Sequence, residues 1–117
     1  MPFWRDRVIQ PALDSGVEAE VREQEKLVRS EPANPAPQFA LGTLAHFRGQ
    51  TEAAIGHFEK ALKLDPSYAA PYVSLGRIYA VWGDYDRAWR YARDAAERGD
   101  SSLVEQLGRY SRPPEGQ

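Results

Sequence analysis

Two histidines are the side chains in this sequence that are best suited to chemistry. His46 and His57 are separated by eleven positions, and the local pattern places them on opposite helices of one hairpin. A zinc site needs about three or four protein ligands, but neither histidine has a carboxylate at ligand spacing and the chain contains no cysteine. We therefore expect no metal site and no cofactor.

Other catalytic arrangements are also missing. The sequence contains no recognisable combination of Ser, His and Asp for nucleophilic catalysis, and no glycine-rich loop follows a predicted strand to cradle a phosphate. Asp84 and Asp86 lie in a predicted turn, where they are better placed to cap a helix than to exchange protons with a substrate. We expect no catalytic residues, and hence a protein that is not an enzyme.

Charge and hydropathy exclude further classes. The chain has 15 Lys and Arg against 17 Asp and Glu, so it lacks the basic excess of a nucleic-acid binder. Arginines are frequent from Arg77 onward, but acidic residues alternate with them, which is typical of a solvated helix face. No stretch approaches the roughly 18–20 apolar residues of a membrane span. The lack of cysteine is compatible with a reducing cytoplasm, where we expect the protein.

A repeat of 34 residues organises the middle of the chain. Residues separated by this interval are small or apolar in both copies and recur at helical intervals, so they describe a packing pattern rather than a chemical site. The matched pairs are Pro37 and Pro71, Leu41-Gly42 and Leu75-Gly76, Leu44 and Ile78, Gly49 and Gly83, Ala54 and Ala88, and Ala61 and Ala95.

Each copy has the pattern of a helix, a turn and a second helix. In the first copy, Pro37 suits a helix start, Gly49 allows the backbone to leave the helix, and a second helix is predicted over 51–64. In the second copy, Gly83 provides the turn and Asp84 is the predicted N-cap of the following helix.

Glycines also lie inside the predicted helices. Gly42 and Gly76 occupy the same position in the two copies, although glycine costs about 1 kcal/mol relative to alanine in a helix interior. The repetition of that cost predicts a close approach between helices, with Ala54 and Ala88 on the other side of the contact.

The pattern closely resembles the tetratricopeptide repeat, whose unit is an antiparallel helix pair. The residues that carry the resemblance are Leu41-Gly42, Ala54, Phe58, Ala61 and Pro66 in the first copy, and Tyr72, Leu75-Gly76, Tyr79, Ala88 and Ala95 in the second. The first copy departs from the family by having Ala45 where an aromatic residue is usual. The second has Ala92 for the later aromatic residue and Asp100 for the closing proline. The resemblance covers Asn34 to about Asp100 and implies an all-α, right-handed superhelix of antiparallel helix pairs, an α-solenoid.

The flanks of the repeats are predicted to be helical too, because stacked repeats expose apolar ends that must be covered. The segment 102–105 predicts a capping box that opens a C-terminal capping helix, and the segment 15–18 predicts another that opens a helix running to about Ser30. Residues 15–31 are therefore predicted to be the second half of a degenerate repeat, whose missing first half would be residues 2–14, interrupted by Pro11. Whether residues 1–14 form a paired helix or fill the groove is left open.

These boundaries predict five segments. They are 1–33 for the N-terminal helices with the degenerate half repeat, 34–68 for the first repeat, 69–100 for the second repeat, 101–112 for the capping helix and 113–117 for a disordered tail.

The resemblance implies a binding groove, since in this family the first helix of each pair lines the concave face. The corresponding residues are Phe39, Thr43, His46 and Phe47 from one helix, and Val73, Arg77, Ala80 and Val81 from the other. Such a groove is mixed apolar with one cation at Arg77, which suits an extended peptide or an amphipathic helix with an acidic group. Family members that hold the C-termini of chaperones use a clamp of Lys and Asn. Here Phe39, Thr43 and Arg77 occupy those places, so we do not predict a chaperone-tail binder.

Together these features predict a non-enzymatic scaffold or interaction module that binds a protein or peptide partner, and not nucleic acid. The alternative is a self-assembling structural subunit, a homo-oligomer in which another copy covers the groove or the repeat ends. That alternative stays open because few repeats leave marginal stability.

Overall fold

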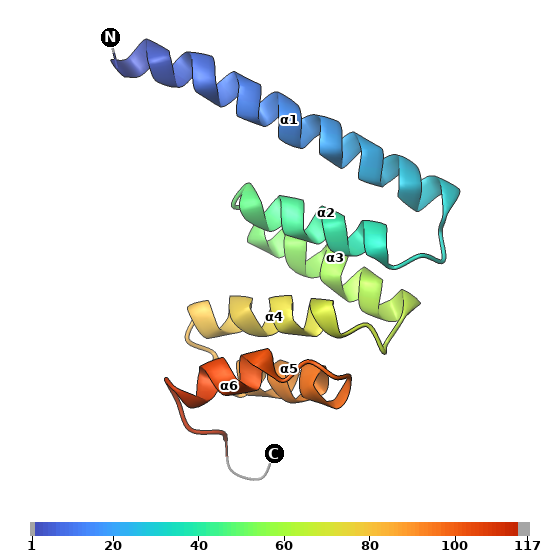
Figure 1. Ribbon diagram of the computed structural model, residues 1–117, viewed down its shortest axis with the longest axis vertical. Coiled ribbons are helices and arrows are strands. Elements are labelled where there is room, and N and C mark those ends of the chain that lie inside the picture. Colours follow the sequence, from blue (N-terminus) through green and yellow to red (C-terminus); the bar gives the residue numbers. More distant parts are fainter. Residues whose placement is uncertain (1, 115–117) are drawn as a thin grey trace.

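The chain forms a curved layer of antiparallel helices (Figure 1). The computed structural model describes the backbone of residues 2–114 and the side chains of residues 16–114, and all regular structure in that part is helical. The helices are, in order, α1 (Pro2–Ser30), α2 (Ala36–Phe47), α3 (Thr51–Leu64), α4 (Ala69–Val81), α5 (Tyr85–Glu97) and α6 (Ser102–Gly108). Each packs against its neighbours in sequence, which gives a layer of 54 × 40 × 20 Å.

Two helical hairpins form the centre of the molecule, α2 with α3 and α4 with α5. Their bounds follow the sequence repeat. α2 ends at Phe47 and α4 ends at Val81, 34 residues later, and the partner helices begin at Thr51 and Tyr85 with the same interval. The predicted all-α fold of antiparallel helix pairs is therefore confirmed.

Glycine turns connect the two helices of each hairpin. Gly49 and Gly83 have φ angles of 78° and 80°, in the left-handed region that residues with a side chain rarely adopt. Asp84 follows the second of these turns and caps α5 as predicted, because its Oδ1 accepts a hydrogen bond from the backbone N–H of Arg87 at 3.2 Å. Local sequence alone thus determines where these helices end and begin.

The C-terminal helix begins differently from the prediction. Asp100 Oδ1 accepts hydrogen bonds from the backbone N–H of Ser102 at 3.0 Å and from its hydroxyl at 2.6 Å. The N-cap is Ser101, which makes no side-chain cap hydrogen bond, so the predicted capping box starting at Ser102 is wrong. α6 ends at Gly108 and is shorter than the predicted capping helix. The predicted tail, 113–117, lies mostly outside the described residues.

The N-terminal segment departs most from the sequence prediction. α1 is one continuous helix, so the predicted break at Pro11 and the predicted helix start at 15–18 are wrong. Proline removes a backbone hydrogen bond and tends to kink a helix, but it does not have to end one. The C-terminal half of α1 lies against α2. The N-terminal end of α1 extends past the hairpins (Figure 1).

Buried side chains form a core that runs through both hairpins. One cluster lies between α2, α3 and α4 and contains Ala45, Ala54, Phe58, Leu75 and Ile78. The other lies between α4, α5 and α6 and contains Tyr72, Val73, Ala88, Trp89, Ala92, Ala95, Leu103 and Leu107. Partly buried Leu62 and Tyr91 pack against both clusters, so the core is continuous along the stack of helices.

The glycines inside helices mark close approaches between helices, as predicted. A Cβ atom added at Gly42 would lie 2.5 Å from Cε1 of the Phe58 ring, and one added at Gly76 would collide with Leu103 of α6. The nearest atoms belong to Phe58 and Leu103, and the backbone oxygen of the predicted Ala88 also lies 3.3 Å from the Cβ added at Gly76. Ala92 occupies the position of Phe58 in the second repeat, so α6 supplies the bulk that this repeat lacks.

Gly42→Ala is expected to lower the free energy of unfolding by roughly 1–3 kcal/mol, because overpacking a well-filled core forces side chains out of their preferred positions. Phe58 is only 1 % exposed, so a displaced ring would lose contacts with the core cluster. Gly56→Ala is the matched control: this glycine lies inside α3, and no atom lies within 4 Å of an added Cβ. That change is expected to raise stability by up to about 1 kcal/mol. Urea unfolding followed by circular dichroism measures both, and equal effects would contradict the close approach.

Candidate functional site

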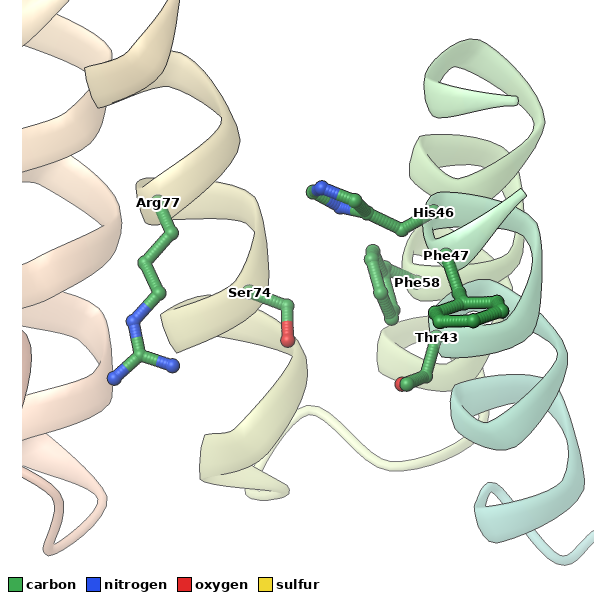
Figure 2. Close-up of a pocket in the computed structure, with 6 residues that line it drawn as sticks. All are labelled: Thr43, His46, Phe47, Phe58, Ser74 and Arg77. Carbon is green, nitrogen blue, oxygen red and sulfur yellow. The ribbon is translucent and has the colours of Figure 1, made fainter. Parts of the chain in front are cut away.

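A pocket of about 280 Å³ opens between α2 and α4 (Figure 2). Three helices contribute its lining, which consists of Thr43, His46 and Phe47 from α2, Ser74 and Arg77 from α4, and Phe58 from α3. Four of these residues were predicted for the groove, and the structure brings them together from two different helices.

α2 presents its pocket residues because its opposite face is buried. Leu41 and Ala45 are each 7 % exposed. With about 3.6 residues per turn, Thr43, His46 and Phe47 fall on the other side of the helix. The Thr43 hydroxyl donates a hydrogen bond to a backbone carbonyl of the preceding turn at 3.2 Å, which holds this side chain against the helix.

The α2 side of the pocket is aromatic. Phe47 is 72 % exposed, whereas Phe58 is 1 % exposed and presents its ring between the two helices (Figure 2). The His46 imidazole extends from α2 toward α4, and Ser74 extends back toward α2. A large aromatic side chain exposed beside a buried one is a common starting point for a contact with another protein.

Arg77 supplies positive charge at the edge of the pocket, on the side of α4 away from α2 (Figure 2). Its Nη2 donates to Oε1 of Gln106 in α6 at 3.5 Å, which is the long limit of a hydrogen bond. Among the described residues, none of the ion pairs within 4.0 Å involves Arg77. The pKa of Asp100 is lowered mainly by its hydrogen bonds from Ser102, and Arg77 adds only a smaller effect. The guanidinium therefore keeps donors free for another carboxylate.

Three further residues predicted for the groove lie outside this pocket. Phe39 is half-buried, and its ring centroid lies 5.6 Å from that of Phe58 and 5.5 Å from that of Tyr68. Ala80 is partly buried against the core of the second hairpin. Val81 is 83 % exposed at the end of α4 but does not line the pocket.

The placement of Val73 in an open groove is wrong. Its side chain is 6 % exposed and belongs to the core cluster that includes Leu103 and Leu107 of α6. α4 is the first helix of the second hairpin, and α6 covers this part of its surface because the end of a repeat stack must be closed. The accessible surface of α4 is therefore narrower than the repeat pattern implies.

Sequence reasoning missed two pocket residues, Phe58 and Ser74. Ser74 lies three residues before Arg77, and this helical spacing is the signal that could have identified it. Phe58 carries no such signal, because its position in the repeat and its helical spacing correctly predict a core residue. Only the separation of α2 from α4 opens its ring to the pocket.

The two histidines lie in different surroundings. His46 lines the pocket, whereas Nδ1 of His57 lies 2.8 Å from Oε1 of Gln38. The residues with described side chains contain no group of three or more His, Cys, Asp and Glu that could hold a metal ion. No described helix combines the length and the apolar character that crossing a membrane requires.

Comparison with known proteins identifies the repeat. The family model described as TPR repeat, the tetratricopeptide repeat, matches residues 45–81. Among solved structures, the crystal structure of MamA is similar to this chain with a TM-score of 0.66 and 21 % sequence identity. The match covers 84 % of this chain and 54 % of that chain, so this chain spans about half the length of MamA in that structure. No curated protein sequence matches. Residues 45–81 therefore match a tetratricopeptide repeat, and the helix pairs of the chain form an α-solenoid.

The two phenylalanines predicted for the groove are expected to differ in their effect on stability. Phe39→Ala should lower the free energy of unfolding by roughly 2–4 kcal/mol, because it removes a half-buried ring from contact with Phe58 and Tyr68. Phe47→Ala should change it by less than about 0.5 kcal/mol, because its ring is mostly exposed. Chemical denaturation measures both, and a large loss for Phe47→Ala would place Phe47 in the core instead of at a binding surface.

Proposed function

We propose that this tetratricopeptide repeat protein is a non-enzymatic interaction module that holds a segment of a partner protein in the pocket between α2 and α4. The observation that carries the proposal is Phe47, whose ring is 72 % exposed beside the nearly buried ring of Phe58. Tetratricopeptide repeats generally mediate contacts between proteins, which supports the class of function.

The size of the pocket favours a single anchoring side chain. Its volume of about 280 Å³ is below the roughly 300–1,000 Å³ that is typical of sites for small molecules and cofactors. A Leu or Phe side chain buried there contributes about 1.5–3 kcal/mol. Because Phe47 and Phe58 form the wall and the base, we expect the anchor to be an aromatic or a branched aliphatic residue.

The charge at the pocket edge favours an acidic residue beside that anchor. Arg77 faces no carboxylate within 4.0 Å among the described residues. Its planar guanidinium can donate two parallel hydrogen bonds to a carboxylate, a geometry that lysine cannot provide. Since the site is open to solvent, this part of the affinity is expected to weaken as salt is added.

The chemistry of the lining supports binding over catalysis. Among the six lining residues, His46 is the one candidate general base, and no carboxylate lies with it. The Thr43 hydroxyl already donates its proton to a backbone carbonyl. General acid–base catalysis needs a positioned donor and acceptor pair around a reacting group, and this set does not supply one.

Selection of random displayed peptides on the immobilised protein is expected to enrich sequences that pair one large apolar residue with Asp or Glu. The double variant Phe47→Ala/Arg77→Ala should weaken binding of the best peptide by roughly 30- to 1,000-fold, because it removes both the aromatic wall and the cation. Fluorescence polarisation with the labelled peptide measures the dissociation constants.

Arg90→Ala/Tyr110→Ala is the matched control, since it removes an exposed arginine and an exposed aromatic residue outside the pocket. Its affinity should equal that of the unmodified protein. Replacing the acidic residue of the peptide with its amide should weaken binding to the unmodified protein but not to Arg77→Ala. Affinity that is indifferent to Phe47 and Arg77 would refute this site.

A homo-oligomer is our second candidate, favoured by a different set of exposed side chains. α2, α4 and α6 all end on the same side of the molecule (Figure 1). Phe47 and Val81 are the last residues of α2 and α4, and Tyr110 follows α6; they are 72 %, 83 % and 79 % exposed. Exposed apolar residues gathered at one end of a stack support contact between copies.

Light scattering at increasing protein concentration tests this second candidate. Self-assembly predicts a mass that rises above the 13.2 kDa of one chain, and that returns to it in Val81→Glu/Tyr110→Glu. A mass that stays at 13.2 kDa at the highest concentration would end this proposal.

A further inference from the structure

A second, smaller pocket lies on the opposite face of α2, where the C-terminal half of α1 meets α2 and α3. It encloses about 100 Å³, which is space for one ring. Leu41 and Ala45 are its buried lining residues, His57 is partly buried, and Glu25, Arg48 and Ala53 are exposed around it. None of these residues lines the first pocket.

The repeat supplies a second copy of this junction, and the two can be compared position by position. Residues 34 positions later lie where α3, α4 and α5 meet. Several lining positions keep the same type of residue, namely Val21 and Ile55, Glu25 and Glu59, and Leu41 and Leu75. The two junctions therefore have the same arrangement of helices, and the positions at which their residues differ show how each junction is filled.

An aromatic stack fills the second junction. The rings of Tyr79 and Tyr91 are stacked, with centroids 5.7 Å apart and planes at 10°. Trp82 meets Tyr79 edge to face at 5.7 Å and 85°. The guanidinium carbon of Arg87 lies 5.2 Å from the centre of the Tyr79 ring. Tyr79 is thus enclosed by two aromatic rings and one cation.

The first junction has a different set of residues at these four positions. The positions of Tyr79, Tyr91, Trp82 and Arg87 are occupied by Ala45, His57, Arg48 and Ala53. Ala45 provides no ring and Ala53 provides no guanidinium, so the space that these groups fill in the second junction is open here as a pocket. His57 and Arg48 remain as walls around it.

We propose that this pocket binds an aromatic side chain of a partner protein that stands next to a basic residue. The ring takes the place that the Tyr79 ring has in the second junction, and the neighbouring cation takes the place of the Arg87 guanidinium. This site is separate from the pocket at Phe47, and neither proposal depends on the other.

His57 is suited to be the stacking face for the incoming ring. Its Nδ1 lies 2.8 Å from Oε1 of Gln38 on α2, which fixes the plane of the imidazole. Burial, and to a lesser extent Lys60, lower the pKa of His57, and Glu25 of α1 opposes them with a smaller effect. The imidazole is therefore neutral at pH 7 and stacks on another ring without bringing a charge into the pocket.

The charges at the rim select the basic neighbour. Arg48 already has an acidic partner, since its Nη2 lies 4.0 Å from a carboxylate oxygen of Glu18. Glu25 takes part in none of the ion pairs within 4.0 Å among the described residues. Because Ala53 leaves the position of the cation empty, a Lys or Arg of the partner beside the aromatic residue faces the free carboxylate of Glu25.

Titration of the ¹⁵N-labelled protein with N-acetyl-Tyr-Arg-amide tests the proposal by nuclear magnetic resonance. We expect saturable shifts at the backbone amides of Ala45, Ala53 and His57. N-acetyl-Leu-Arg-amide should bind about tenfold more weakly, because it cannot stack on the imidazole. N-acetyl-Tyr-Glu-amide should also bind more weakly, because its carboxylate faces Glu25.

Ala45→Tyr places a ring in the pocket from within the chain and should abolish the saturable shifts while the helical circular dichroism is retained. Ala33→Tyr adds the same ring at an exposed position before α2 and should leave binding unchanged. If Ala45→Tyr does not fold, Ala45→Tyr/Ala53→Arg/His57→Tyr copies the second junction in full and tests the same point.

Several results would overturn the proposal: no saturable shifts, equal binding of the Tyr-Arg and Leu-Arg peptides, or binding that survives in the filled variant. Shifts confined to Thr43, His46 and Phe47 would place the peptide in the first pocket and would also overturn it. Binding of free p-cresol without binding of the Tyr-Arg peptide would assign the pocket to a small aromatic molecule and refute the protein partner.

Discussion

The close contact between α2 and α3 at Gly42 is the constraint on which the rest of the structure depends. Because Gly42 has no side chain, the Phe58 ring packs directly against the backbone of α2, and this contact carries the ring to the base of the pocket. A similar close contact occurs at Gly76, where the side chain of Leu103 packs against the backbone of α4. α6 is therefore more than a polar cover for the end of the stack, since it supplies the large side chain that Ala92 does not.

The repeat gives both hairpins the same helix arrangement, and the residues that differ between them determine where a pocket forms and where side chains fill the space. The second hairpin is closed on one side by α6, which buries Val73, and on the other by the stack of Tyr79 on Tyr91. The first hairpin has neither, and α2 borders one pocket with Thr43, His46 and Phe47 and another with Leu41 and Ala45. Both pockets for which we propose binding thus lie at the first hairpin, although both hairpins follow the same pattern.

The sequence predicts those features that depend on local backbone and helical spacing. The hairpins, the turn glycines Gly49 and Gly83, and the Asp84 cap all belong to this class. Three features could not be predicted in this way. α1 is continuous only if the helical hydrogen bonds on both sides of Pro11 stabilise the helix more than the hydrogen bond missing at Pro11 destabilises it. The burial of Val73 depends on a contact with α6, which is distant in the sequence. The two pockets depend on the distances between helices, and residue spacing along a single helix does not determine those distances.

Departures from the repeat pattern fall into two physical classes, and this distinction bears on function. Ala92 departs from the pattern at a position where an aromatic residue is usual, and Leu103 compensates for it, so that departure serves packing. Ala45 departs in the same way, but within the described chain no other side chain fills the space, which remains open as a pocket. The aromatic stack that the second hairpin has and the first lacks contributes about 0.5–1.5 kcal/mol per ring pair. A departure that forgoes this stabilisation and leaves a shaped space is a stronger indication of a ligand than one that a neighbouring helix repairs.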